Sequence, residues 1–223
     1  MIIAFACSKG GVGKTTATVQ LAGEIKPDLI IDQDAHEGIT WINNRRPADS
    51  RWNVVSRLSK EELINHINMA RASKKLVIID CGGFDSELTR IAIAASDMTI
   101  CPLNDDITEQ IGMVRFNGIM ADISKKAGTH ITAHVIMTRT NPSRKNFTAI
   151  REAVESLDHL TMMESRLSKR ADFPTQMESG LGITERTATR NSEAGKEVAA
   201  FAEEVREKLK TTKGYSEKSV YRS

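Results

Sequence analysis

The fold is decided by residues 8–16, which read Ser8-Lys9-Gly10-Gly11-Val12-Gly13-Lys14-Thr15-Thr16. A continuous apolar run, residues 2–7 (IIAFAC), precedes this loop and predicts a buried strand, and a helix is predicted from Lys14 to Ile25. Glycines permit tight turns that point successive backbone N–H groups at a phosphate chain. The N-terminus of the helix adds unpaired N–H groups and the positive end of its dipole. The order strand, loop, helix therefore predicts a phosphate-binding loop (P-loop).

Two side chains at the end of this loop match the chemistry of a triphosphate. Lys14 is predicted to reach the β- and γ-phosphates, and the Thr15 hydroxyl is predicted to ligate Mg²⁺. The strict P-loop pattern has glycine where this chain has Ser8. The loop is therefore a variant of that pattern, placed between the two elements that the pattern requires.

Acidic residues lie at the ends of two further apolar runs. Asp32 and Asp34 stand at the end of the run 29–32 (LIID), and Asp80 ends the run 75–80 (KLVIID). Because Mg²⁺ prefers hard oxygen ligands and keeps several waters, we predict that Asp80 holds the metal through water, with Asp32 as a second candidate. An aspartate in this place can instead cap the next helix or turn, and that interpretation stays open.

Strands and helices alternate along the rest of the chain. Further strands are predicted at 97–102 and 131–137, and amphipathic helices at 60–72, 86–95, 107–126, 146–156 and 196–210. This alternation predicts an α/β fold with a doubly wound, mainly parallel sheet and helices on both faces. We expect a single P-loop ATPase domain over residues 1–210, followed by a polar, flexible tail over 211–223.

Composition excludes several classes of protein. Lys and Arg total 31 against 29 for Asp and Glu, so a DNA contact must come from a local patch rather than from bulk charge. No apolar run is long enough to cross a bilayer, and the N-terminus lacks a basic leader and a cleavage site, so we expect a cytoplasmic protein. The widely spaced Cys7, Cys81 and Cys101 are predicted to be small core residues in a reducing compartment.

The segment KGGVGKTT, residues 9–16, resembles the "deviant" Walker A loop of the ParA/MinD family of P-loop ATPases, and the resemblance extends along the whole chain. It implies ATP and Mg²⁺ as cofactors, and a homodimer that forms on ATP binding with Lys9 reaching the partner's nucleotide. It implies catalytic roles for Lys9, Lys14 and Asp34, the last orienting the attacking water. The implied nucleotide-binding residues are Lys9, Gly10, Gly11, Val12, Gly13, Lys14, Thr15, Thr16, Thr138 and Arg139, and the implied metal-binding residues are Thr15, Asp32 and Asp80.

The chain departs from the family pattern at two places. The family usually continues D-x-D-P-Q, whereas Ala35 and His36 follow Asp34 here, which leaves the rate of hydrolysis open. His36 either titrates near neutrality or lies on the surface of a mobile switch loop. Gly82 and Gly83 stand where many relatives have proline, and they either bring a backbone N–H to the γ-phosphate or form a simple turn.

Residues 165–185 resemble the short plasmid-encoded ParA proteins, and we expect no DNA-reading domain before the first strand. This implies an ATPase that binds DNA non-specifically to segregate or position plasmid or chromosomal DNA, without membrane binding. Its hydrolysis would be stimulated by a small DNA-binding partner protein of ParB type. Candidate phosphate contacts are Arg144, Lys145, Arg166, Lys169, Arg170, Arg186 and Arg190. The alternative is a ParA-like regulatory or positioning ATPase that acts on a protein machine for conjugation or secretion, with little DNA binding.

Overall fold

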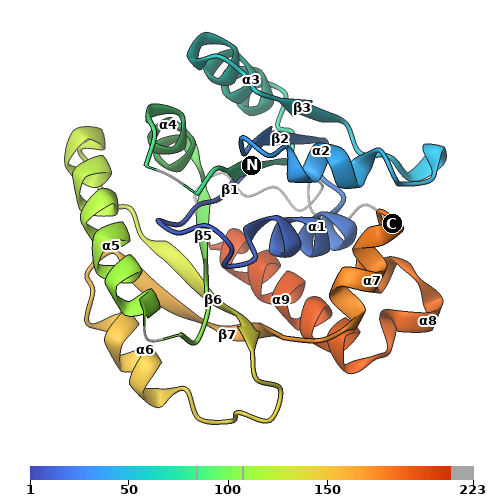
Figure 1. The fold of residues 1–223 in the computed structure, drawn as a ribbon. Coiled ribbons are helices and arrows are strands. Elements are labelled where there is room, and N and C mark those ends of the chain that lie inside the picture. Colours follow the sequence, from blue (N-terminus) through green and yellow to red (C-terminus); the bar gives the residue numbers. More distant parts are fainter. Residues whose placement is uncertain (84, 107, 212–223) are drawn as a thin grey trace.

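The centre of the molecule is a parallel β-sheet with helices on both faces (Figure 1). The computed structural model describes residues 1–83, 85–106 and 108–211. In these ranges the strands are β1 (Ile2–Phe5), β2 (Leu29–Gln33), β3 (Val54–Ser56), β4 (Val77–Cys81), β5 (Met98–Leu103), β6 (Ala133–Thr140) and β7 (Leu160–Ser168). Their order across the sheet is β3-β2-β4-β1-β5-β6-β7, and every pairing between them is parallel.

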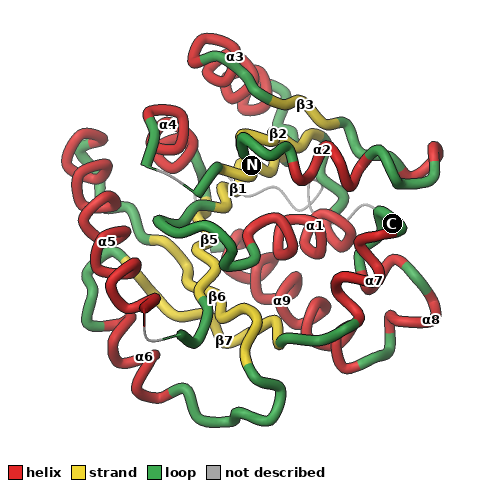
Figure 2. Tube along the Cα trace, viewed as in Figure 1, coloured by secondary structure: helices red, strands yellow, loops and turns green. Residues whose placement is uncertain are grey.

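Helices connect the strands and surround the sheet (Figure 2). They are α1 (Lys14–Ile25), α2 (Gly38–Asn43), α3 (Lys60–Ala72), α4 (Glu87–Ala95), α5 (Thr108–Ala127), α6 (Thr148–Glu155), α7 (Asp172–Glu178), α8 (Thr187–Arg190) and α9 (Glu193–Lys210), with short 3₁₀ turns η1 (Ala48–Ser50) and η2 (Ile183–Glu185). No helix within the described ranges combines the length and the apolarity that a membrane crossing needs.

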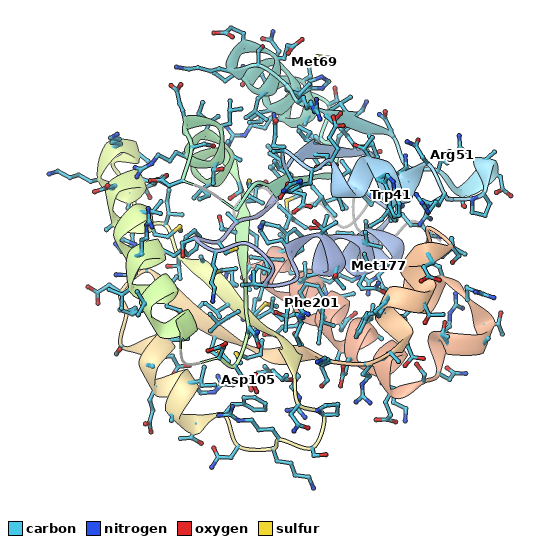
Figure 3. The ribbon with its side chains drawn as sticks, viewed as in Figure 1. Trp41, Arg51, Met69, Asp105, Met177 and Phe201 are labelled. Carbon is cyan, nitrogen blue, oxygen red and sulfur yellow. The ribbon has the colours of Figure 1, made fainter. Side chains whose placement is uncertain are left out.

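The sheet is buried on both faces because successive residues of a strand point to opposite sides. In β1, Ile2 and Ala4 belong to one hydrophobic core, whereas Ile3 and Phe5 belong to the other. Helices α3, α4, α5 and α6 pack on the first face, and α1 and α9 pack on the second, with Phe201 of α9 fully buried (Figures 1 and 3). Two covered faces explain why this strand is continuously apolar.

The predicted fold class is confirmed, and the sheet is parallel throughout rather than mainly so. Of the predicted elements, the helices at 14–25 and 60–72 are reproduced to the residue, and the others shift by one to three residues at one or both ends. Helix α9 begins at Glu193 rather than 196 because the Ser192 hydroxyl caps the Gly195 N–H at 3.1 Å. The predicted start of the helix at 107 and the tail at 212–223 lie outside the described residues.

Both edge strands escaped the sequence analysis. An edge strand pairs on one side only and tolerates polar residues, so it lacks the apolar run that marks a central strand. Strand β7 carries Glu164, Ser165 and Arg166 in its middle, and β3 spans only Val54–Ser56. The short helices α2, α7 and α8 escaped for a related reason, since each is too brief to show a helical period.

The topology places the loops of the candidate site together. In parallel strands all carboxyl ends lie at one edge of the sheet, and ligands bind where the strand order reverses. Strand β1 sits between β4 and β5, and the chain crosses from one side of β1 to the other after β4. The glycine-rich loop after β1 therefore faces the loops that follow β2, β4 and β6.

Candidate nucleotide-binding site

The glycine-rich loop has the backbone that a phosphate cradle needs. Gly11 and Gly13 adopt φ angles of +79° and +93°, a region that residues with a Cβ rarely enter. Helix α1 then starts at Lys14, and its first turn closes with the Ala17 N–H donating to the Gly13 carbonyl at 2.9 Å. The predicted order of strand, loop and helix is therefore present with the N-terminus of α1 at the end of the loop.

Strand β6 holds this loop from the side. The buried Thr138 hydroxyl donates to the Val12 carbonyl at 2.6 Å and lies 3.2 Å from the Leu103 carbonyl. The Arg139 guanidinium donates to the Gly11 carbonyl at 2.8 Å. Both residues are predicted to contact an adenine base, whereas here their side chains contact the backbone of the loop. Their role toward the base stays a prediction, and their contact with the loop is an addition to it.

The serine that departs from the strict pattern ties the loop to α5. The Ser8 hydroxyl donates to the Gly112 carbonyl at 2.7 Å, a bond that glycine cannot make. The neighbouring Lys9 is exposed, and its carbonyl accepts from the Cys7 thiol at 2.9 Å. All three cysteines are buried and none forms a disulfide, as predicted for core residues.

The metal corner is built from Thr15 and Asp80. The Thr15 hydroxyl donates to Asp80 Oδ2 at 3.0 Å, and Asp80 is 0% exposed. Its second oxygen, Oδ1, is buried and has no hydrogen-bond partner among the described residues. Burial raises the pKa of this carboxyl to about 7, while the nearby Lys14 ammonium opposes the shift. A buried carboxylate oxygen without a partner, beside a threonine hydroxyl, fits the donor set of Mg²⁺ or of a water bound to it.

Asp32 is held by the start of α2. Its Oδ2 accepts from the Thr40 N–H at 2.9 Å and from the Thr40 hydroxyl at 3.0 Å. Burial raises the pKa of Asp32, and the bonds from Thr40 act in the opposite direction. The carboxylate therefore fixes the first turn of α2, which is the capping interpretation left open above. Asp32 Oδ1 also accepts from the Asp34 N–H, and the negative charge of Asp32 raises the pKa of Asp80. A metal role for Asp32 through water stays a prediction.

Asp34 and the two residues after it line the mouth of the site. Asp34 is half-buried, and its Oδ1 accepts from the His36 N–H at 2.9 Å, which closes a small turn. Ala35 and His36 are exposed and line the same cleft. Asp34 therefore lines the same cleft as the glycine-rich loop, and its role in orienting water stays a prediction.

The loop after β4 touches the glycine-rich loop. A Cβ on Gly83 would lie 3.3 Å from Gly10 Cα and 3.6 Å from Lys14 Nζ, so a side chain here would crowd both. Lys14 itself is only 6% exposed. Glycine thus allows two backbones and one buried ammonium to converge. Whether Gly83 also senses the γ-phosphate stays a prediction.

These parts enclose a cleft of about 970 Å³ whose far wall was missed by the sequence analysis. That wall comes from the end of β7 and from α7, the latter represented by Met177 in Figure 3. It consists of Leu167, Ser168, Lys169, Arg170, Ala171, Phe173, Pro174 and Met177. The sequence did contain a signal for this wall. Two apolar residues, Phe173 and Pro174, follow the basic pair 169–170, and proline is common in the first turn of a helix.

The residues proposed for DNA phosphates fall into separate places. Arg144 pairs with Asp105 at 3.2 Å, and Arg170 pairs with Glu197 at 2.7 Å. The Arg190 guanidinium donates to the Thr184 carbonyl at 2.7 Å. Lys169 and Arg170 line the cleft, whereas Lys145 and Arg166 line a smaller cavity beside α6. Two of the predicted residues therefore line the cleft and two line the smaller cavity.

Comparison with known proteins gives a coherent set of relatives. No family model matches the chain. The protein ParA of Rhizobium radiobacter is 22% identical over 146 residues, which covers 64% of this chain and 66% of that protein, just under two thirds of its length. The crystal structure of a putative plasmid partition protein from Borrelia burgdorferi B31 bound to AMPPNP has a TM-score of 0.68 and 18% identity, covering 93% of this chain and 98% of that one.

A second solved structure carries a metal. The septum site-determining protein MinD from Pyrococcus horikoshii OT3, complexed with Mg-ADP, has a TM-score of 0.62 and 17% identity, covering 92% of this chain and 95% of that one. These matches confirm the resemblance to the ParA/MinD family that residues 9–16 indicate.

Proposed function

We propose that this chain, which has the fold of the ParA/MinD ATPases, is an ATP-driven switch that holds and releases DNA. ATP would bind in the cleft, two copies would close on it, and hydrolysis would open them again. The cycle would segregate or position plasmid or chromosomal DNA in the cytoplasm.

The observation that carries the proposal is the buried corner formed by Lys14, Thr15 and Asp80. Lys14 is 6% exposed and Asp80 is 0% exposed, yet Asp80 Oδ1 has no partner among the described residues. A fold does not leave such an oxygen buried without cost, because an unsatisfied buried acceptor destabilises the native state. A Mg²⁺ ion with its waters would satisfy it, and Lys14 would face the phosphates. Relatives solved with AMPPNP and with Mg-ADP support this proposal.

The two walls of the cleft suit the two ends of ATP. Backbone N–H groups of residues 10–16 would surround the phosphates, with Thr15 and Asp80 holding Mg²⁺ and Asp32 supporting it through water. Apolar atoms of Leu167, Phe173 and Pro174 would face the base, together with Thr138 and Arg139. When bound, Mg²⁺ would neutralise charge on the phosphates.

Hydrolysis would depend on positioning by side chains of this chain. Asp34, at the mouth of the cleft, would accept a hydrogen bond from the attacking water and so orient it toward the γ-phosphate. Lys14 would stabilise negative charge that develops on the phosphoryl oxygens. His36 donates its backbone N–H to Asp34, which fixes the orientation of that carboxylate.

Closure of two copies would complete the site. Lys9 is exposed, as a residue that serves a second copy must be. The adjoining face of α5 presents Ile111 and Val114 with 76% and 62% of their surface exposed, next to the bond between Ser8 and Gly112. Apolar side chains so exposed gain stability when a partner covers them. An ATP-bound dimer would bury this face and place each Lys9 at the partner's phosphates.

A gel-shift titration of duplex DNA, with ATP, with ADP and without nucleotide, tests this function. We expect a shift with ATP only, and phosphate release that rises when DNA and a small DNA-binding partner protein of ParB type are added. An equal shift in all three conditions would contradict the switch.

A second candidate is an adaptor that uses the same ATP cycle to act on a protein machine. Trp41 on α2, labelled in Figure 3, favours it. This indole is 56% exposed, and the Arg45 guanidinium lies 3.0 Å from the centroid of its ring. The first turn of the same helix is bonded to Asp32, one of the predicted metal-binding residues. ATP-dependent dimers that never shift DNA at any salt concentration would favour this candidate.

A further inference from the structure

A second, smaller cavity of about 270 Å³ lies between β6, β7 and α6. We call it the α6 groove, and the residues that matter for its chemistry are Lys145, Phe147, Thr148, Arg151, Glu164 and Arg166. They come from the loop after β6, the start of α6 and the middle of β7. No part of the nucleotide cleft described above is included in it.

The charges of the α6 groove do not balance. Three cations, Lys145, Arg151 and Arg166, face one carboxylate, Glu164. That carboxylate is already used, because Arg151 pairs with Glu164 at 2.9 Å and with Glu155 at 3.4 Å. In the part of the chain that the structure describes, Lys145 and Arg166 have no carboxylate within 4.0 Å. The groove therefore presents two uncompensated positive charges.

An aromatic ring places the cations of this region. The Phe147 ring has the Arg166 guanidinium 5.2 Å from its centroid and the Arg144 guanidinium 5.0 Å from it. Arg144 is fixed further by Asp105 at 3.2 Å and by the Asn146 carbonyl at 3.1 Å. Contacts with an aromatic face limit the rotamers of arginine without neutralising its charge. Less side-chain entropy is then lost when an anion binds.

The groove is joined to the nucleotide cleft through β6. Arg139, near the end of this strand, bonds the Gly11 carbonyl in the phosphate loop, and the strand continues directly into the loop that carries Lys145. The Lys169 N–H donates to the Thr140 carbonyl at 2.8 Å, which ties the end of β7 to the end of β6. Both Lys169 and Arg139 line the cleft.

We propose that the α6 groove seats a backbone phosphate of duplex DNA, with Lys145 and Arg166 as the contacting cations. This rests on the proposed function and locates its DNA contact. Lysine and arginine side chains that approach a phosphate from a shallow surface bind without reading bases, which suits non-specific binding. The small volume fits one phosphate group rather than a whole nucleotide, and the Thr148 hydroxyl adds a further donor.

The test compares the double variant Lys145→Gln, Arg166→Gln with the matched double variant Lys125→Gln, Lys126→Gln. The control pair is exposed in the last turn of α5 and removes the same charge. DNA affinity with ATP is measured by fluorescence anisotropy as a function of salt. We expect about tenfold weaker binding for the groove variant, and a slope of log affinity against log salt that is shallower by about two for each chain that contacts the duplex. The control variant should stay close to the wild type.

Three readouts separate the outcomes. Melting temperature and ATP-dependent dimerisation of the groove variant show that the fold and the nucleotide cleft are intact. Inorganic phosphate is titrated against the wild type and the groove variant without DNA. Phosphate binding that the groove variant loses, together with undiminished DNA affinity in that variant, would identify the groove as a site for free phosphate and overturn its assignment to DNA. Wild-type affinity and slope in the groove variant would overturn the inference alone, whereas a wild type that never binds DNA would overturn the proposed function as well.

Discussion

The nucleotide cleft and the α6 groove are both cationic, but they hold their charges in opposite ways. At the cleft, Lys14 is buried and acts electrostatically on the buried Asp80, and glycine backbone supplies further donors. In the groove, Lys145 is exposed and Arg166 lies at the surface against Phe147. Buried charges are screened little by salt, and exposed ones are screened strongly. The buried charges of the cleft therefore suit one tightly placed ligand. The exposed charges of the groove suit a weak contact that any phosphate of a DNA backbone can make.

Replacing Lys14 should have the largest effect and should touch only the cleft. In Lys14→Ala the buried ammonium is lost beside Asp80, and we expect affinity for ATP to fall by about 100-fold or more, since a charge-assisted contact with a phosphate is lost in a buried site. Titration with a fluorescent ATP analogue measures this. Lys125→Ala, which removes an exposed lysine from α5, is the control. If Lys14→Ala kept its affinity for the nucleotide, the cleft would not be the ATP site.

Salt should separate the two sites almost as sharply. If two copies each seat two cations on DNA phosphates, affinity for DNA should fall by about 100-fold between 50 and 200 mM salt. Affinity for Mg-ATP should change by less than about threefold over the same range, because the charges of the cleft are buried. Parallel titrations of DNA and nucleotide at several salt concentrations give both slopes. Equal slopes of log affinity against log salt for DNA and for nucleotide would contradict the difference in screening between the two sites.

Asp80→Asn should sharpen the assignment of the metal corner. The variant keeps an acceptor for the Thr15 hydroxyl but loses the negative charge, so we expect the gain in nucleotide affinity that Mg²⁺ provides to fall by about tenfold. Without Mg²⁺ the variant should be at least as thermally stable as the wild type, because a buried carboxylate is costly. Binding measured with Mg²⁺ and with EDTA tests the first expectation. An undiminished effect of Mg²⁺ would place the metal elsewhere.

The smallest effect concerns β6, the strand that both sites share. Burial lowers the pKa of His134 on β6 to about 4, with Lys208 acting in the same direction and Glu204 opposing it. A histidine in the unfolded chain has a pKa near 6.5. The stability that neutral His134 contributes is therefore fully present above pH 6.5 and is lost as the pH falls toward about 4. The melting temperature of His134→Gln should therefore fall less steeply over this window than that of the wild type. The exposed His36→Gln is the control, and identical slopes for all three proteins would contradict the expectation.

The parts of the molecule that were predictable are those whose signal is local. Consecutive residues form the buried strand, the glycine loop and α1, so a short window of sequence predicts all three. Asp32 and Asp80 each end a clear apolar run. The far wall of the cleft was not predictable, because β7 is an edge strand whose Glu164, Ser165 and Arg166 break the apolar pattern. The predicted domain limits and the individual site residues remain predictions.

Contacts between distant residues set the other limit. Thr138 meets Val12 across 126 positions, and nothing in either segment indicates that a threonine at the end of β6 bonds the phosphate loop. The α6 groove likewise joins Lys145 to Arg166 through the pairing of β6 with β7, a pairing that needs the missed strand. The cations themselves were visible in the sequence, but their grouping was not.

A crystal structure with Mg²⁺ and a non-hydrolysable ATP analogue is the sharpest test of the nucleotide site and of the dimer. We expect a triphosphate against residues 10–16 with Mg²⁺ near Thr15 and Asp80, the base against the wall at Leu167 and Phe173, and two chains joined across Lys9. A loop without nucleotide in a solitary chain, under conditions where the analogue is saturating, would contradict it.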